Sequence, residues 1–159
     1  MFGKKKQARL KSGILGMGHI DYCVKNNLIA ITPYDPEKLV PYGYQICMPE
    51  ELVVYSRVDK FDMKSDNKEF RETIKIPKEG QMLRPGNLYL AIPDTEFGCL
   101  YPNTYASIYG LEQNEKLGIF VHKDFPSASS AVLPITVVYP TIVYVGMPIA
   151  TISFVINEY

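Results

Sequence analysis

The residues best suited to acid–base chemistry lie in segment 110–118, which reads Gly-Leu-Glu-Gln-Asn-Glu-Lys-Leu-Gly. It holds two carboxylates, Glu112 and Glu115, and the ammonium group of Lys116. A carboxylate can take or give a proton at a reacting group, and a lysine can bind a phosphate oxygen. If the chain is an enzyme, these three side chains and Glu96 are candidates for its catalytic groups. The same residues also suit a solvated turn and the end of a short helix.

Other chemistries have less support from the sequence. His19 and His122 are far apart and neither has a carboxylate partner in a motif, so we interpret each as structural or exposed. The cysteines Cys23, Cys47 and Cys99 are odd in number and lack the Cys-x-x-Cys spacing of a zinc site, so we interpret them as buried thiols. Glycine-rich phosphate loops and nucleophile elbows are absent from the sequence. We therefore expect no protein-bound cofactor and no metal.

The elements that must position these side chains are mostly strands. Twelve prolines and eleven glycines divide the chain at intervals too short for a helical bundle. Short apolar or alternating runs predict strands within 28–32, 44–48, 51–55, 88–92, 116–122, 132–139 and 141–156. One helical turn is predicted at 110–116. The pattern predicts an all-β fold, a distorted β-barrel or jelly roll with at most one short helix.

The overall composition is that of a single globular domain with balanced charge. The chain has 159 residues, and its 17 basic residues match 17 acidic ones. This balance argues against a general binder of nucleic acid or of membrane surfaces. We divide the chain into a basic N-terminal arm, 1–18, and one β domain, 19–159. The arm could dock on a partner or on nucleic acid, or be a plain tail. No run approaches the apolar length of a membrane span, so we expect no membrane partner.

Four segments carry a family pattern in the same order along the chain. They are Ile-Ala-Ile-Thr-Pro-Tyr-Asp-Pro at 29–36, Pro-Tyr-Gly-Tyr-Gln-Ile-Cys-Met at 41–48, the run 82–96 that begins Met-Leu-Arg-Pro-Gly, and Val-Gly-Met-Pro-Ile-Ala-Thr-Ile-Ser-Phe at 145–154. This series resembles the dCTP deaminase branch of the dUTPase superfamily. The resemblance implies a β-clip fold, a homotrimer with active sites between subunits, and chemistry on deoxynucleoside triphosphates.

The chain departs from that family at the residues that do the chemistry. Where the family has Gly-Arg-Ser-Ser-Leu-Ala-Arg-Leu-Gly, this chain has Leu111, Glu112 and Gln113 in place of Arg-Ser-Ser, and Lys116 in place of the last Arg. The glutamate that the resemblance implies as general base falls on Thr136. A threonine cannot accept a proton near neutral pH, and two glutamates near a triphosphate would repel it.

Three functions remain open at this point. The leading hypothesis is a non-catalytic, trimeric structural or interaction component, such as a capsid-associated viral protein with protein partners in a larger assembly. It would lie in the cytoplasm or in a particle assembled inside the cell. The alternative is a divergent dCTP deaminase or dUTPase that uses Glu112, Glu115 and Lys116 and binds Mg²⁺ together with its nucleotide. The third is a binding module that senses nucleotides without converting them.

Overall fold

The structure is a computed structural model that describes residues 12–56, 62–122 and 131–157, in which strands predominate. The strands are β1 (Gly13–Ile14), β2 (Ile29–Thr32), β3 (Leu39–Val40), β4 (Gly43–Cys47), β5 (Glu51–Tyr55), β6 (Arg71–Lys75), β7 (Gln81–Leu83), β8 (Leu88–Ala91), β9 (Glu96–Cys99), β10 (Thr104–Gly110), β11 (Ile119–Val121), β12 (Leu133–Val137), β13 (Thr141–Val143) and β14 (Pro148–Ile156). The helices are α1 (Met17–Lys25) and α2 (Glu112–Glu115), with short 3₁₀ turns at Pro36–Lys38 and Lys68–Phe70.

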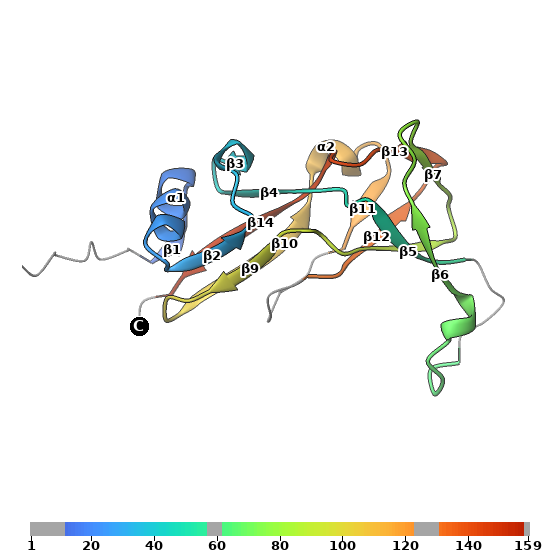
Figure 1. Cartoon of the computed structure of the whole chain (residues 1–159), viewed down its shortest axis with the longest axis horizontal. Coiled ribbons are helices and arrows are strands. Elements are labelled where there is room, and N and C mark those ends of the chain that lie inside the picture. The colour runs from blue at the N-terminus through green and yellow to red at the C-terminus, as the bar shows by residue number, and fades with distance from the viewer. Residues whose placement is uncertain (1–11, 57–61, 123–130, 158–159) are drawn as a thin grey trace, which may run out of the picture.

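The long strand β14 lies at the centre of the first sheet. β10 pairs with it antiparallel from Thr104 opposite Ile156 to Gly110 opposite Ala150. β4 and β1 also pair with β14, and β3 continues the sheet beyond β4. Figure 1 shows β14 running alongside β10 and β4 through the middle of the molecule. Most of its side chains are buried, and its sequence is accordingly a nearly continuous apolar run.

The second sheet has the strand order β11-β12-β8-β5-β6. Side chains of these strands alternate between a buried face and an open face, as the two-residue period of a strand requires. On β12, for example, Leu133, Ile135 and Val137 are buried while Pro134 and Thr136 are only half-buried. One face of this sheet therefore belongs to the core and the other is available to a ligand or a partner.

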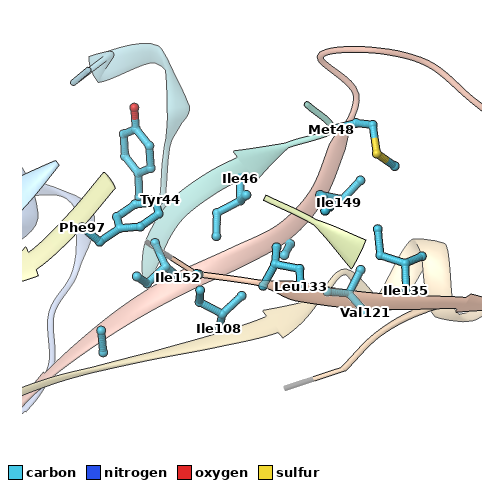
Figure 2. Packing of buried hydrophobic residues seen from close by; sticks show 14 of the residues in the cluster. Tyr44, Ile46, Met48, Phe97, Ile108, Val121, Leu133, Ile135, Ile149 and Ile152 are labelled. Carbon is cyan, nitrogen blue, oxygen red and sulfur yellow. The ribbon is translucent and has the colours of Figure 1, made fainter. Parts of the chain in front are cut away.

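Buried side chains from both sheets meet in one continuous core. Figure 2 shows this core as a row of side chains, in which Leu133 of the second sheet lies near Ile108 and Ile152 of the first. The same cluster includes Tyr44, Ile46 and Ile149 of the first sheet and Val121 and Ile135 of the second. These eight side chains are all at least nine-tenths buried. Burial of apolar surface is the main force that holds such sheets together. The two sheets therefore form one packed body, with β12 in contact with the core along one face.

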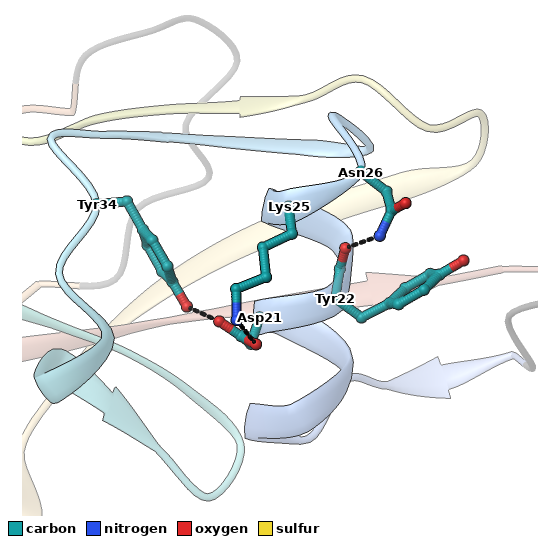
Figure 3. Close-up of polar contacts among 5 residues, drawn as sticks. All are labelled: Asp21, Tyr22, Lys25, Asn26 and Tyr34. Carbon is teal, nitrogen blue, oxygen red and sulfur yellow. Dashed lines mark hydrogen bonds and ion pairs between the residues drawn. The ribbon is translucent and has the colours of Figure 1, made fainter.

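Helix α1 is held to the domain by its buried side and by a small polar network. Ile20 and Cys23 on this helix are fully buried. On its other side, Asp21 accepts hydrogen bonds from Lys25 Nζ at 2.6 Å and from the Tyr34 hydroxyl at 2.7 Å (Figure 3). The ring of Tyr34 stacks near that of Tyr44, with 6.0 Å between centroids. This network connects the helix to the loop that follows β2.

The sequence-based description of the fold is confirmed in its main lines. The chain is all-β, the expected strands are present, and the expected helical turn is α2. Within the described residues the sheets stay open rather than closing into a barrel, and α1 is a further helix that the sequence did not predict. Residues 1–11 of the expected basic arm lie outside the described residues, while Gly13–Ile14 pair with β14. None of the described helices is long and apolar enough to span a membrane.

Candidate functional site

Segment 110–118 leaves the first sheet at the end of β10 and reaches the second sheet at β11. The short helix α2 between them is anchored by Asn114, which is buried and donates from Nδ2 to the carbonyl oxygen of Pro148 at 3.2 Å. At the far end, Gly118 has a φ of +81°, and a Cβ there would stand 3.1 Å from Val138 Cβ. Glycine therefore fits this turn better than any other residue. The Val138 N–H donates to the Gly118 carbonyl at 2.8 Å, which attaches the segment to the end of β12.

The charged side chains of this segment point into solvent. Lys116 Nζ lies 2.7 Å from Glu112 Oε1, one helical turn away, and the two side chains are 72% and 81% exposed. Gln113 and Glu115 are also exposed, whereas Leu111 is half-buried. The structure thus brings Glu112 and Lys116 together as an ion pair. Glu96, the other candidate, lies on β9 in a separate two-stranded sheet, opposite Thr32.

Thr136 lies on the open face of the second sheet, near an imidazole. It is half-buried on β12 and paired with Phe120 of β11. His122 follows β11, and its backbone N–H donates to the Pro134 carbonyl at 2.9 Å. The side chains then meet, with 3.2 Å between His122 Nε2 and Thr136 Oγ1. The structure therefore places an exposed imidazole beside Thr136, the position at which we looked for a base in the sequence and found none.

This pair was not predicted from the sequence, for a definite reason. The two residues are 14 positions apart, and no motif joins them. Their contact depends on the register of β11 on β12, which places Val121 opposite Ile135. The alternation of apolar residues in the two strands was a signal that Phe120, His122, Pro134 and Thr136 share one face. That signal gives the face but not the register.

A hollow lies on the same open face, nearer the other edge of the sheet. Its volume is about 420 Å³. Leu90, which is paired with Pro134 of β12, lines it together with Val53 of β5 and Thr73 of β6. The remaining lining residues are Pro49, Glu50, Glu51, Leu52, Ile92 and Asp94. The carboxylates at its border do not favour a phosphate group, but a carboxylate can accept hydrogen bonds from an amino group.

The described residues hold no group of three or more His, Cys, Asp or Glu placed to bind a metal ion. All three cysteines are free. Cys23 is buried, and this burial raises the pKa of its thiol. Cys47 is half-buried and Cys99 is exposed, so the expectation of three buried thiols was wrong for Cys99.

Comparison with a solved structure supports the expected fold. The structure of 2'-deoxycytidine 5'-triphosphate deaminase from Agrobacterium tumefaciens superposes with a TM-score of 0.72 at 18% sequence identity. The superposition covers 94% of this chain and 49% of that one, so this chain spans about half the length of the solved protein. The β-clip fold of the dUTPase type is confirmed.

Sequence comparison identifies the family. The model of the dCTP deaminase-like family matches residues 14–156. A protein of Leptospira biflexa named "dCTP deaminase, dUMP-forming" is 38% identical over 133 residues, which cover 79% of this chain and 72% of the relative. A protein of the same name from Cytophaga hutchinsonii is 34% identical over 133 residues, covering 79% of this chain and 73% of the relative. The chain belongs to the dCTP deaminase-like family.

These relatives correct the leading functional hypothesis. We expected a non-catalytic structural protein of a viral particle, and that expectation was wrong, because similar proteins at 34–38% identity are named for dCTP deamination. The alternative of a dCTP deaminase is the one they support. We did not consider from the sequence that Glu112 has a cationic partner, and the Lys116 ammonium at 2.7 Å offsets part of the charge of this carboxylate.

Proposed function

We propose that this protein catalyses the hydrolytic deamination of dCTP. The observation that carries the proposal is the 38% identity, over 79% of the chain, to a protein named "dCTP deaminase, dUMP-forming". In this reaction a water oxygen replaces the 4-amino group of the cytosine ring, and ammonia leaves. The open face of β11, β12 and β8 supports the proposal because it combines apolar side chains with the polar groups of His122 and Thr136.

Lys116 is the proposed contact for the triphosphate. Its ammonium is exposed and is paired with Glu112 on the surface of α2. A phosphate oxygen can replace that carboxylate as partner, since both are anionic acceptors. Mg²⁺ would enter with the triphosphate, because hard cations prefer oxygen ligands and commonly bind through substrate phosphates. Glu112 and Glu115 then lower the positive charge around the triphosphate, and neither contacts the cytosine ring.

We also propose that the active form is a homotrimer. The stretch of chain that connects β12 to β14, and includes β13, has several large exposed side chains with apolar surface, namely Val138, Tyr139, Ile142, Tyr144 and Val145. Contiguous exposed apolar surface commonly marks an interface. The mass of the protein in solution, measured by light scattering after size-exclusion chromatography, tests this. A monomer at micromolar concentration would contradict it.

The test of the function is a direct assay of product. The full chain is incubated with dCTP and Mg²⁺ at high protein concentration, and dUTP, dUMP and ammonia are followed by chromatography and a coupled ammonia assay. We expect ammonia to form in step with dUTP plus dUMP, and no ammonia with dATP as control nucleotide. Binding of dCTP without ammonia would contradict deamination and favour a sensing module. Release of dUMP from added dUTP would show that a second hydrolytic step occurs in the same protein.

A further inference from the structure

We propose that His122, held by Thr136, is the group that takes the proton from the attacking water in this deamination. This inference rests on the proposed function and names the base that it requires. Deamination at C4 of cytosine needs a group that takes a proton from the attacking water. The described residues of β8, β11 and β12, with the residue following β11, contain one histidine, and it is His122. An imidazole is the side chain that most often serves as a general base.

The backbone fixes the position of this ring. β11 and β12 pair antiparallel with Phe120 opposite Thr136, and the His122 N–H continues the pairing by donating to the Pro134 carbonyl at 2.9 Å. Because Val121 and Ile135 point into the core, the residues next to them point to the open face. His122 therefore projects from an ordered strand pair and remains exposed to solvent.

The hydroxyl of Thr136 sets the orientation and the tautomer of the imidazole. Its Oγ1 lies 3.2 Å from His122 Nε2. In the tautomer that the proposal requires, the Nε2–H donates to Oγ1 and the lone pair lies on Nδ1, ready to accept a proton. The hydrogen-bond partner of one ring nitrogen commonly decides whether the other nitrogen carries a proton. Thr136 is thus a positioning residue, and His122 is the catalytic one.

The surroundings of the pair suit a pyrimidine ring. Phe120 is 39% exposed beside Thr136, and Pro134 and Leu90 continue the apolar surface across β12 and β8. An aromatic or apolar surface can stack against the flat face of a base, whichever base it is. Beyond Leu90 this surface leads into the hollow described above, whose carboxylates can accept hydrogen bonds from the amino group of cytosine.

The reaction balances with His122 as the sole proton carrier. His122 Nδ1 takes one proton from water while the water oxygen bonds to C4 of cytosine. The π electrons of the C4–N3 bond move to N3, and N3 then receives that proton from the imidazole. The imidazole next takes the proton of the new hydroxyl group on C4 and passes it to the 4-amino nitrogen. The C4–O bond becomes double, the C4–N4 bond breaks and ammonia leaves. Cytosine and water have become uracil and ammonia, and the imidazole is unchanged.

The test compares histidine variants in the full chain. We expect His122→Ala to keep the fold and dCTP binding while losing about 10²- to 10⁴-fold in ammonia release, the usual contribution of a general base. Added imidazole should restore part of the rate. The double variant with Thr136→Glu should restore activity too, because it supplies a carboxylate on the same face. His19→Ala, which changes an exposed histidine on α1, is the matched control and should be fully active.

The outcomes separate this inference from the proposed function. An active wild type with an equally active His122→Ala variant would overturn the inference and leave the function standing. A second result would also overturn the inference alone. In this result the His122→Ala variant loses dCTP affinity by the same factor as its rate, and neither added imidazole nor Thr136→Glu restores the rate. A folded wild type that binds dCTP and releases no ammonia would overturn both.

Discussion

Gly43 of β4 lies directly against Thr151 of β14. A Cβ on Gly43 would stand 2.4 Å from Thr151 Cγ2 and 2.6 Å from the carbonyl oxygen of Ile152. Atoms do not approach so closely, and the second obstacle is backbone that cannot rotate away. Glycine at this position is therefore what lets β4 pair closely with the central strand.

Gly43→Ala should destabilise the fold by about 1–3 kcal/mol, the usual cost of overpacking. Chemical denaturation followed by circular dichroism measures it. Gly18→Ala is the matched control, because Gly18 lies in α1 and a Cβ added there would meet no atom within 4 Å, so it should be neutral or stabilising. Equal stability of Gly43→Ala and the wild type would show that β4 and β14 are not packed as described.

Tyr34→Phe should lower the melting temperature, by roughly 2 °C. The substitution removes the 2.7 Å hydrogen bond from the Tyr34 hydroxyl to Asp21 and loosens the attachment of α1. Differential scanning calorimetry at neutral pH measures the change. Tyr22→Phe alters an exposed tyrosine of α1 itself and serves as control. A melting temperature equally lowered in both variants would contradict a specific role for the Tyr34 bond.

Asp21→Asn should make stability less sensitive to acid. The Lys25 ammonium and then the Tyr34 hydroxyl hold the pKa of Asp21 below its ordinary value. A lowered pKa means that the contribution of this carboxylate is complete above about pH 4 and is lost as the pH falls through the folded-state pKa. Melting temperatures from pH 7 to pH 2 should therefore fall less steeply in the variant. A wild type and variant with parallel pH profiles would contradict the assignment.

The strands were predictable because their signal is local. Glu51–Tyr55 and Leu88–Ala91 have the alternation and residue types of half-buried strands, and each forms a strand at the expected place. Helix α1 was missed because its local signals are weak. Its N-cap is Gly16, which has no side chain to cap the helix, and its first turn contains no acidic residue. Burial of Ile20 and Cys23 against the domain stabilises a helix that the sequence alone does not favour.

The candidate site was predictable only in part. The ion pair of Glu112 and Lys116 follows from their spacing of four residues, which is a local rule, yet we considered Glu112 as a catalytic candidate and as a repulsive charge, and not as a partner of Lys116. The contact of His122 with Thr136 depends on which residues of two strands lie opposite one another, and that register is a property of the folded sheet.

Leu133→Ala should destabilise the protein by about 2–5 kcal/mol, the range for a leucine removed from a packed core. Leu133 is fully buried on β12 and lies among core residues of both sheets. Urea denaturation measures the change, and Val132→Ala, at a residue 44% exposed, should stay within about 0.5 kcal/mol of the wild type. Similar losses in the two variants would show that β12 does not face the core as described.

Glu112→Gln and Lys116→Gln should change dCTP affinity in opposite directions. Glu112→Gln frees the Lys116 ammonium from its 2.7 Å partner and removes a negative charge, so affinity should rise. Lys116→Gln removes the proposed phosphate contact and should weaken binding. Each change should be about two- to fivefold, because exposed ion pairs contribute about 1 kcal/mol or less. Titration calorimetry measures both, and 0.5 M salt should reduce the difference by screening. Changes of the same sign in both variants would contradict a role for Lys116 in binding phosphate, whereas opposite signs would place the triphosphate beside α2.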